Sequence, residues 1–200
     1  MARAKEGSGF VNDGFGSKTA AGGTEFSRVI PPRTGVRARI AGFSYTAGAT
    51  AHTLTQLNAV DEVSLTSDAA SGQAVININK APTAPDGSVM ANTDWFIVQH
   101  EDGNWEDYKI SSVSGLAVTL TANLDKKVLT GSRAFFMGQP SDHSDRQFTI
   151  DASQTLTISG GDDRNCIGAA GANNQPIMFH SDNGTNAGIM RWLSYIYGGA

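Results

Sequence analysis

Apolar and polar residues alternate with a period of two along most of the chain after residue 35. Val36, Ala38 and Ile40, for example, alternate with Arg37 and Arg39, which is the pattern of a half-buried β-strand. Phe43 and Tyr45 continue this strand past Gly42, which is interpreted as a bulge. The same criteria predict further short strands at 53–57, 75–79, 95–100, 105–110, 109–113, 116–121, 133–137, 147–150, 155–158, 175–180 and 189–197. The chain is therefore predicted to be all-β.

The segment 87–139 holds the densest set of these predicted strands. An Asp102-Gly103 pair favours a tight hairpin between two of them, and Ser114-Gly115 is predicted as the two-residue turn of a second hairpin. One helical turn is expected within 123–131. Several short strands in about fifty residues indicate a small, strongly bent barrel.

Strand patterning resumes at residue 140, after the predicted barrel. Long connections between strands that pair with each other are normal in Greek-key sandwiches. We therefore predict one β-sandwich built from 36–86 and 140–200, with the small β-barrel of 87–139 inserted at its middle.

The leading segment 1–35 does not have the pattern of a folded unit. It is rich in glycine, and Phe10, Phe15 and Phe26 are too scattered to form a core. A disordered tail is one interpretation. An arm that becomes ordered on a partner surface is the other, and it explains three apolar anchors that a spacer does not need. We predict an extended N-terminal arm.

Composition supports short strands and tight turns, because charged residues are only 17% and 23 residues are glycine. The formal net charge is −4. Residues 1–39 hold seven basic and three acidic side chains, a net +4, which leaves −8 for the rest. A basic arm on an acidic body predicts binding to an acidic neighbour, including another copy of the chain. No run of Lys or Arg with interleaved aromatics occurs, so no specific nucleic acid is expected.

Compartment signals are few. A single cysteine excludes an internal disulfide. The first ten residues contain no apolar run, so no signal peptide is expected, and no segment has the length of a transmembrane helix. We predict a protein made in a cytoplasm and not bound to a membrane.

Candidate chemistry is sparse. Cys166 is either a nucleophile or a small packed residue. His143 lies between Asp142 and Asp145. This cluster of side chains is either a metal site or a solvated turn. The oxygen-rich loops 160–165 and 181–186 can be calcium ligands or ordinary turns. No known catalytic motif appears. We therefore predict no enzymatic activity, no catalytic residue, no metal and no cofactor.

Aromatic residues gather in two places. Trp95, Trp105 and Tyr108 can form a stacking platform for sugars or bases, or else the core of the barrel. The C-terminal aromatics can form an interface patch or pack along an edge strand. The candidate partner-binding residues are Phe10, Phe15, Phe26, Arg28, Arg33, Trp192, Tyr195 and Tyr197.

Three stretches of the sequence resemble structural proteins of tailed bacteriophages. These stretches are 41–55, the barrel stretch 94–98 with 112–121 and 135–138, and 175–188. The resemblance implies a capsid decoration (cement) subunit located in the virion. It implies the major capsid protein and copies of the chain itself, as a homotrimer, as partners. Two alternatives stay open: a tail, fibre or host-surface module that recognises glycans, and a glycan-processing enzyme, which needs two carboxylates facing a cleft.

Overall fold

The computed structural model describes residues 10–13, 25–83, 94–138, 147–159, 174–181 and 188–198. All the regular elements in these ranges are strands, which confirms the predicted all-β class. They are β1 (Phe10–Asp13), β2 (Phe26–Ile30), β3 (Arg37–Thr46), β4 (His52–Ser64), β5 (Val75–Asn77), β6 (Trp95–Gln99), β7 (Trp105–Ser114), β8 (Ala117–Leu120), β9 (Arg133–Gly138), β10 (Gln147–Ile150), β11 (Thr155–Ser159), β12 (Ile177–Ser181) and β13 (Ile189–Gly198). No helix in the described ranges is long and apolar enough to cross a membrane.

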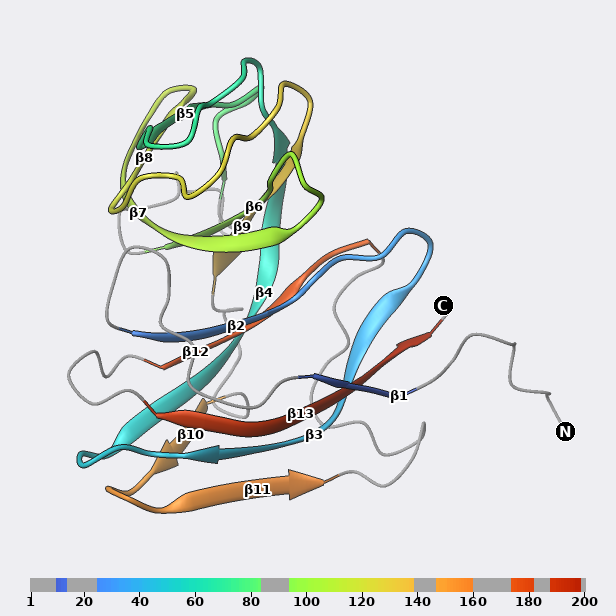
Figure 1. The fold of residues 1–200 in the computed structure, drawn as a ribbon, viewed down its shortest axis with the longest axis vertical. Coiled ribbons are helices and arrows are strands. Elements are labelled where there is room, and N and C mark those ends of the chain that lie inside the picture. Colours follow the sequence, from blue (N-terminus) through green and yellow to red (C-terminus); the bar gives the residue numbers. More distant parts are fainter. Residues whose placement is uncertain are drawn as a thin grey trace, which may run out of the picture.

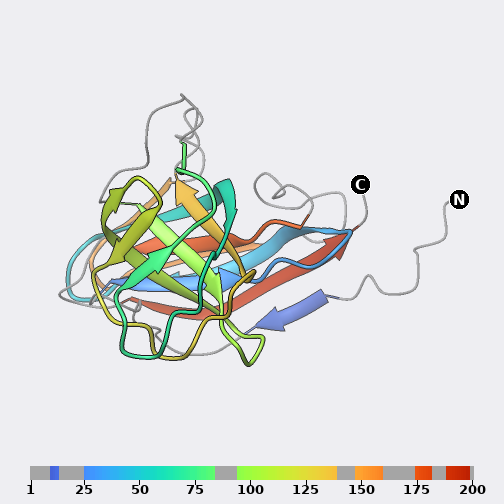
Figure 2. The same cartoon turned by 90° about the horizontal axis from the view of Figure 1, so that it is seen from above.

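The strands form two sheets. The small sheet has the order β1-β13-β3-β11, and the long sheet has the order β2-β12-β4-β9-β6-β7-β8-β5, with β10 also paired to β4. The small sheet lies against one half of the long sheet, and the other half curls into a separate lobe (Figures 1 and 2). The predicted combination of a β-sandwich with a small barrel is therefore present.

The sandwich core fills the space between the small sheet and the first half of the long sheet. Alternate residues of β3 point inward, so Ala38 and Ile40 are each 1% exposed. Phe43 lies at the centre, with ring centroids 5.3 Å from Phe148 and 5.2 Å from Phe179. Strands from both ends of the chain thus supply one core.

The barrel closes because the sheet returns to its own starting strand. An isolated bridge joins Leu65, just after β4, to Ile78, just after β5. The Thr66 amide donates to the Asn77 carbonyl at 3.0 Å beside this bridge. The barrel core accordingly contains Val63, Leu65, Ile76 and Ile78 together with residues of β6 to β9.

These contacts place the boundaries of the barrel differently from the predicted 87–139. The strand β4 runs from the sandwich into the barrel (Figure 1), and its second half pairs with β9 from Asn58 to Ser64. The sequence pattern ended this strand at residue 57. A single strand shared by both lobes makes them one continuous sheet, and residues 58–83 belong to the barrel.

The segment 25–35 is part of the folded body, although it was predicted within the arm. Its strand β2 pairs with β12 from Phe26↔Ser181 to Ile30↔Ile177. Phe26 and Ile30 lie four residues apart on one face of the strand and are 1% and 0% exposed. Two apolar residues suffice for a core strand here because β12 supplies the backbone partners.

Two local predictions in the barrel were wrong. The segment 123–131 forms no helical turn; Leu124 and Val128 instead point into the barrel core, and Val128 bridges to Ala69. The turn between β7 and β8 uses Gly115 and Leu116, one residue later than predicted. Gly115 has a φ of 58°, which glycine adopts without strain, and Leu116 in this turn is 51% exposed.

Candidate functional site

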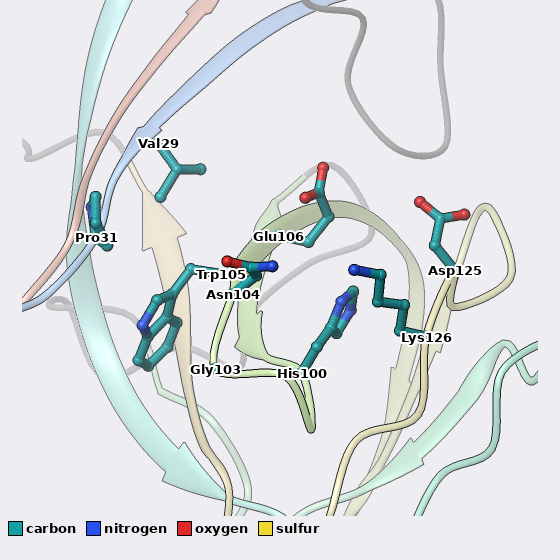
Figure 3. A pocket seen from close by; sticks show the side chains of 9 residues that line it. All are labelled: Val29, Pro31, His100, Gly103, Asn104, Trp105, Glu106, Asp125 and Lys126. Carbon is teal, nitrogen blue, oxygen red and sulfur yellow. The ribbon is translucent and has the colours of Figure 1, made fainter. Parts of the chain in front are cut away.

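A cavity of about 450 Å³ lies beside the β6–β7 hairpin of the barrel, where β2 of the sandwich passes it (Figure 3). Its lining contains apolar, amide and charged side chains from both lobes. They are Val29, Pro31, His100, Gly103, Asn104, Trp105, Glu106, Asp125 and Lys126. These residues come from three segments that are far apart in the sequence, and only the Asp-Gly turn and Trp105 were predicted features of the chain.

The hairpin wall of the cavity is held by Asp102. One carboxylate oxygen accepts the Asn104 amide at 3.0 Å, and the other accepts the Asn104 side-chain Nδ2 at 2.9 Å. Lys126 pairs with the same carboxylate from the opposite wall. The hydrogen bond from Lys126 and those from Asn104 lower the pKa of Asp102 to about 2. Gly103, with a φ of 84°, permits the tight turn that this arrangement requires.

The opposite wall is fixed through a buried tyrosine. The Tyr108 hydroxyl accepts the backbone N–H of Asp125 at 3.1 Å and lies 3.1 Å from His100 Nε2. Burial raises the pKa of Tyr108 to about 12 and lowers the pKa of His100. Both groups are therefore neutral near pH 7.

Stability is expected to decrease as the pH falls below the ordinary histidine pKa of 6.5. The unfolded chain binds a proton at His100 near that pH, whereas the folded chain binds it only at a lower pH, so acid favours the unfolded state. The His100→Gln variant should show a smaller loss of unfolding free energy in urea between about pH 7 and about pH 5. The same loss in parent and variant contradicts this assignment.

The apolar wall of the cavity belongs to a third hydrophobic cluster. Trp105 and Val29 pack against buried residues of β6, β9 and β12, and the Trp105 ring centroid lies 5.7 Å from that of Phe135. Trp95 is 3% exposed and Tyr108 is 0% exposed. Of the three aromatics considered as a stacking platform, only Trp105 lines the cavity.

Glu106 and Asp125 both line this cavity, so the structure brings together two carboxylates, as the glycan-processing alternative requires. In these positions the two carboxylates can accept hydrogen bonds from a ligand. Their positions do not demonstrate glycan cleavage. The prediction of a non-enzymatic protein stays a prediction.

A second polar cluster is buried in the sandwich. His52 Nδ1 lies 2.7 Å from the Tyr45 hydroxyl and 3.1 Å from Ser181 Oγ. The Gly48 amide donates to His52 Nε2 at 3.3 Å, so the ring proton is on Nδ1. A protonated Nδ1 cannot accept the serine proton, and all three side chains are at most 1% exposed. This cluster therefore satisfies buried polar groups and does not form a nucleophile with its base.

Three of the predicted partner-binding residues come together at one corner of the sandwich. The Arg33 guanidinium lies 5.5 Å from the centroid of the Tyr197 ring. Tyr195 and Tyr197 pack edge to face with centroids 5.5 Å apart. The Tyr197 hydroxyl also donates to the Pro31 carbonyl at 2.8 Å. This corner attaches the chain before β3 to the C-terminal strand.

The other candidates lie apart. Phe26 is in the sandwich core, and Arg28 is partly exposed on β2. The Trp192 ring packs over Gly42, and its nearest atoms lie 2.9 Å from the position that a Cβ atom on Gly42 would occupy. Phe10 belongs to β1, which pairs with β13 from Phe10↔Ile196 to Asp13↔Leu193. Phe15 lies outside the described residues.

Several predicted chemical sites also fall outside the described residues. These are Cys166, the cluster around His143, the loop 160–165 and the loop 181–186 after Ser181. Within the described ranges, no group of three or more His, Cys, Asp or Glu side chains is arranged to hold a metal ion.

The basic charge of residues 1–39 is located mainly on the body. Arg28 lies on β2, Arg33 follows that strand, and Arg37 and Arg39 lie on β3. Residues 1–24 keep three basic and two acidic side chains, a net +1. The electrostatic attraction that was predicted for the arm is therefore weak.

Comparison with known proteins places few limits on this chain. No protein family model and no curated protein matches the sequence. Among solved structures it is similar to VP17, a capsid protein of bacteriophage P23-77, with 11% identity, a TM-score of 0.23, and coverage of 95% of this chain and 99% of that chain. A complex of VP16 and VP17, the two major capsid proteins of that phage, matches with 12% identity, a TM-score of 0.24, and coverage of 96% and 99%. TM-scores this low do not establish a shared fold.

Proposed function

We propose that this chain is a non-enzymatic structural protein of a tailed-bacteriophage virion, a decoration (cement) subunit that binds the head shell. Its partners would be the major capsid protein and copies of itself, arranged as a trimer. The resemblance of 41–55, 94–98 with 112–121, 135–138 and 175–188 to such proteins supports the class.

The observation that carries the proposal is the pairing of β1 with the edge of the small sheet. β1 pairs antiparallel with β13. It is the outermost strand on that side of the small sheet among the described residues. Backbone hydrogen bonds hold such a strand, so the edge accepts an extended segment with little regard to its sequence. A sheet edge built in this way is suited to bind an arm.

The same pairing can form between two copies. Eleven residues, 14–24, connect β1 to the segment before β2, and a chain of that length reaches at most about 36–40 Å. Exchange of an identical element between subunits needs no new contact surface. We infer that β1 of one subunit pairs with β13 of the next, which would tie subunits together around the shell.

A pair of cysteines should test the exchange. Asn12 and Ser194 are register partners, and the Cα separation of facing strand residues suits a disulfide. The variant Asn12→Cys with Ser194→Cys, made with Cys166→Ser, should form covalent multimers on a non-reducing gel after mild oxidation. Each single-cysteine variant is the control and should give at most a dimer.

The virion role needs a separate measurement. Deletion of 1–24 should leave the β-type circular dichroism spectrum unchanged and should weaken co-sedimentation with virions of the source phage. Added salt should change the binding little, because residues 1–24 carry only +1. Intramolecular cross-links alone contradict the exchange, and a full chain that never sediments with the particles contradicts the virion role.

A further inference from the structure

The strongest unassigned feature of the molecule is the cavity beside the β6–β7 hairpin, because its two sides differ in chemistry. In Figure 3, Val29, Pro31 and the Trp105 ring lie on one side, and Glu106, Lys126 and Asp125 lie on the other. A volume of about 450 Å³ is within the range of small-molecule sites. The ligand should therefore have an apolar face and a polar edge.

We propose that this cavity binds an uncharged saccharide. A sugar ring presents C–H groups on one face and hydroxyl groups around its edge. The Trp105 ring supplies the flat apolar surface against which such a face packs. The carboxylates of Glu106 and Asp125 accept hydrogen bonds from hydroxyls, and the Asn104 amide can both donate and accept.

Charge argues against an anionic ligand. Lys126 is already paired with Asp102, and the lining also holds the carboxylates of Glu106 and Asp125. His100 cannot offset this, because burial lowers its pKa. A phosphate or sulfate group entering the cavity would meet carboxylates, and like charges brought together oppose binding.

The lining is also a poor site for a small cation. The Lys126 ammonium lies on the same side of the cavity as the carboxylates of Glu106 and Asp125 in the view of Figure 3. The hydrogen bond to Asp102 raises the pKa of Lys126, and the charges of Glu106 and Asp125 add to this effect. A cationic ligand would have to bind next to this ammonium. A neutral hydroxyl-rich ligand can use all three charged groups of the lining as hydrogen-bond partners at once.

The Asn104 side chain and the backbone of both cavity walls are held in place before any ligand binds. Asn104 is fixed by two hydrogen bonds to Asp102. The Asp125 backbone is held by the Tyr108 hydroxyl, and the Glu101 amide donates to the Lys127 carbonyl at 2.9 Å. Because these hydrogen bonds fix the Asn104 side chain and the backbone of both walls, part of the ordering cost of binding is avoided.

Titration of the ¹⁵N-labelled full chain tests the proposal. Glucose, galactose, mannose, N-acetylglucosamine and their disaccharides would be added to millimolar concentration, with phosphate and choline as anionic and cationic probes. At least one saccharide should shift the indole N–H signal of Trp105 and the amide signals of Gly103 and Asn104. The Trp192 indole signal should not move, because Trp192 packs over Gly42 in the small sheet.

Variants localise the effect. Asp125→Asn removes an exposed carboxylate and should weaken saccharide binding about tenfold or more, since charged hydrogen bonds are among the stronger ones. Asp151→Asn, which changes an exposed carboxylate on the sandwich, is the matched control and should bind like the parent. Trp105→Phe should keep part of the affinity and Trp105→Ala should lose it.

Several results would overturn the proposal. They are no response to any saccharide, binding of phosphate or choline in place of saccharides, shifts confined to other parts of the chain, and unchanged saccharide affinity in Asp125→Asn. The site does not depend on a virion role, since it is tested on the isolated chain. It would also serve a host-surface recognition module.

Discussion

Replacement of Gly188 by alanine is expected to lower the free energy of unfolding by about 3 kcal/mol or more. A Cβ atom at this position would lie 1.9 Å from the Tyr45 hydroxyl, far inside contact distance. Tyr45 cannot move aside, because it is fully buried, packs edge to face on Phe26 with centroids 5.2 Å apart, and is hydrogen-bonded to His52.

Gly198 provides the matched control for this substitution. It lies at the other end of β13, and a Cβ atom there meets no atom within 4 Å. Urea unfolding should therefore show a lower midpoint with an unchanged slope for Gly188→Ala and almost no change for Gly198→Ala. Equal stability of the two variants contradicts the packing of Tyr45 against Gly188.

Truncation of Phe26 is the second change with a large expected effect. Phe26→Ala should lower the free energy of unfolding by about 4 kcal/mol, the loss that is typical of a fully buried phenylalanine. The side chain is 1% exposed and belongs to the sandwich core. Phe26→Leu should recover much of this loss, because it refills most of the volume.

The same substitution distinguishes a core strand from an arm. Arg28→Ala, two residues along the same strand and partly exposed, should change stability little. If Phe26→Ala left the isolated chain as stable as the parent and weakened only its association, Phe26 would be an arm anchor, as the sequence pattern predicts. The burial in β2 predicts the opposite result.

The cavity shows why a site can be built from unremarkable sequence. Asn104 and Trp105 lie in a hairpin that the Asp-Gly pair predicted correctly. Asp125 comes from a segment with no recognisable motif, and Val29 comes from a segment assigned to the arm. Their proximity depends on the β2–β12 pairing and on the closed barrel, which are contacts between residues far apart in the chain.

The sequence by itself determined the class of structure and the position of most strands. Alternation along β3 and along β6 to β9 encodes which face of each strand is buried, since the period of two depends only on local backbone geometry. The glycine at 103 likewise encodes its turn, because its φ of 84° is a local property of the backbone.

Only the tertiary structure decided which strands share a sheet. β4 runs past residue 57 because β9 offers it backbone partners up to Ser64, and β2 is a strand because β12 lies beside it. Neither partner is near in sequence. Hydrogen bonds between distant strands are set by the packing of the whole core, and a pattern read along one segment contains no information about which segment lies next to it.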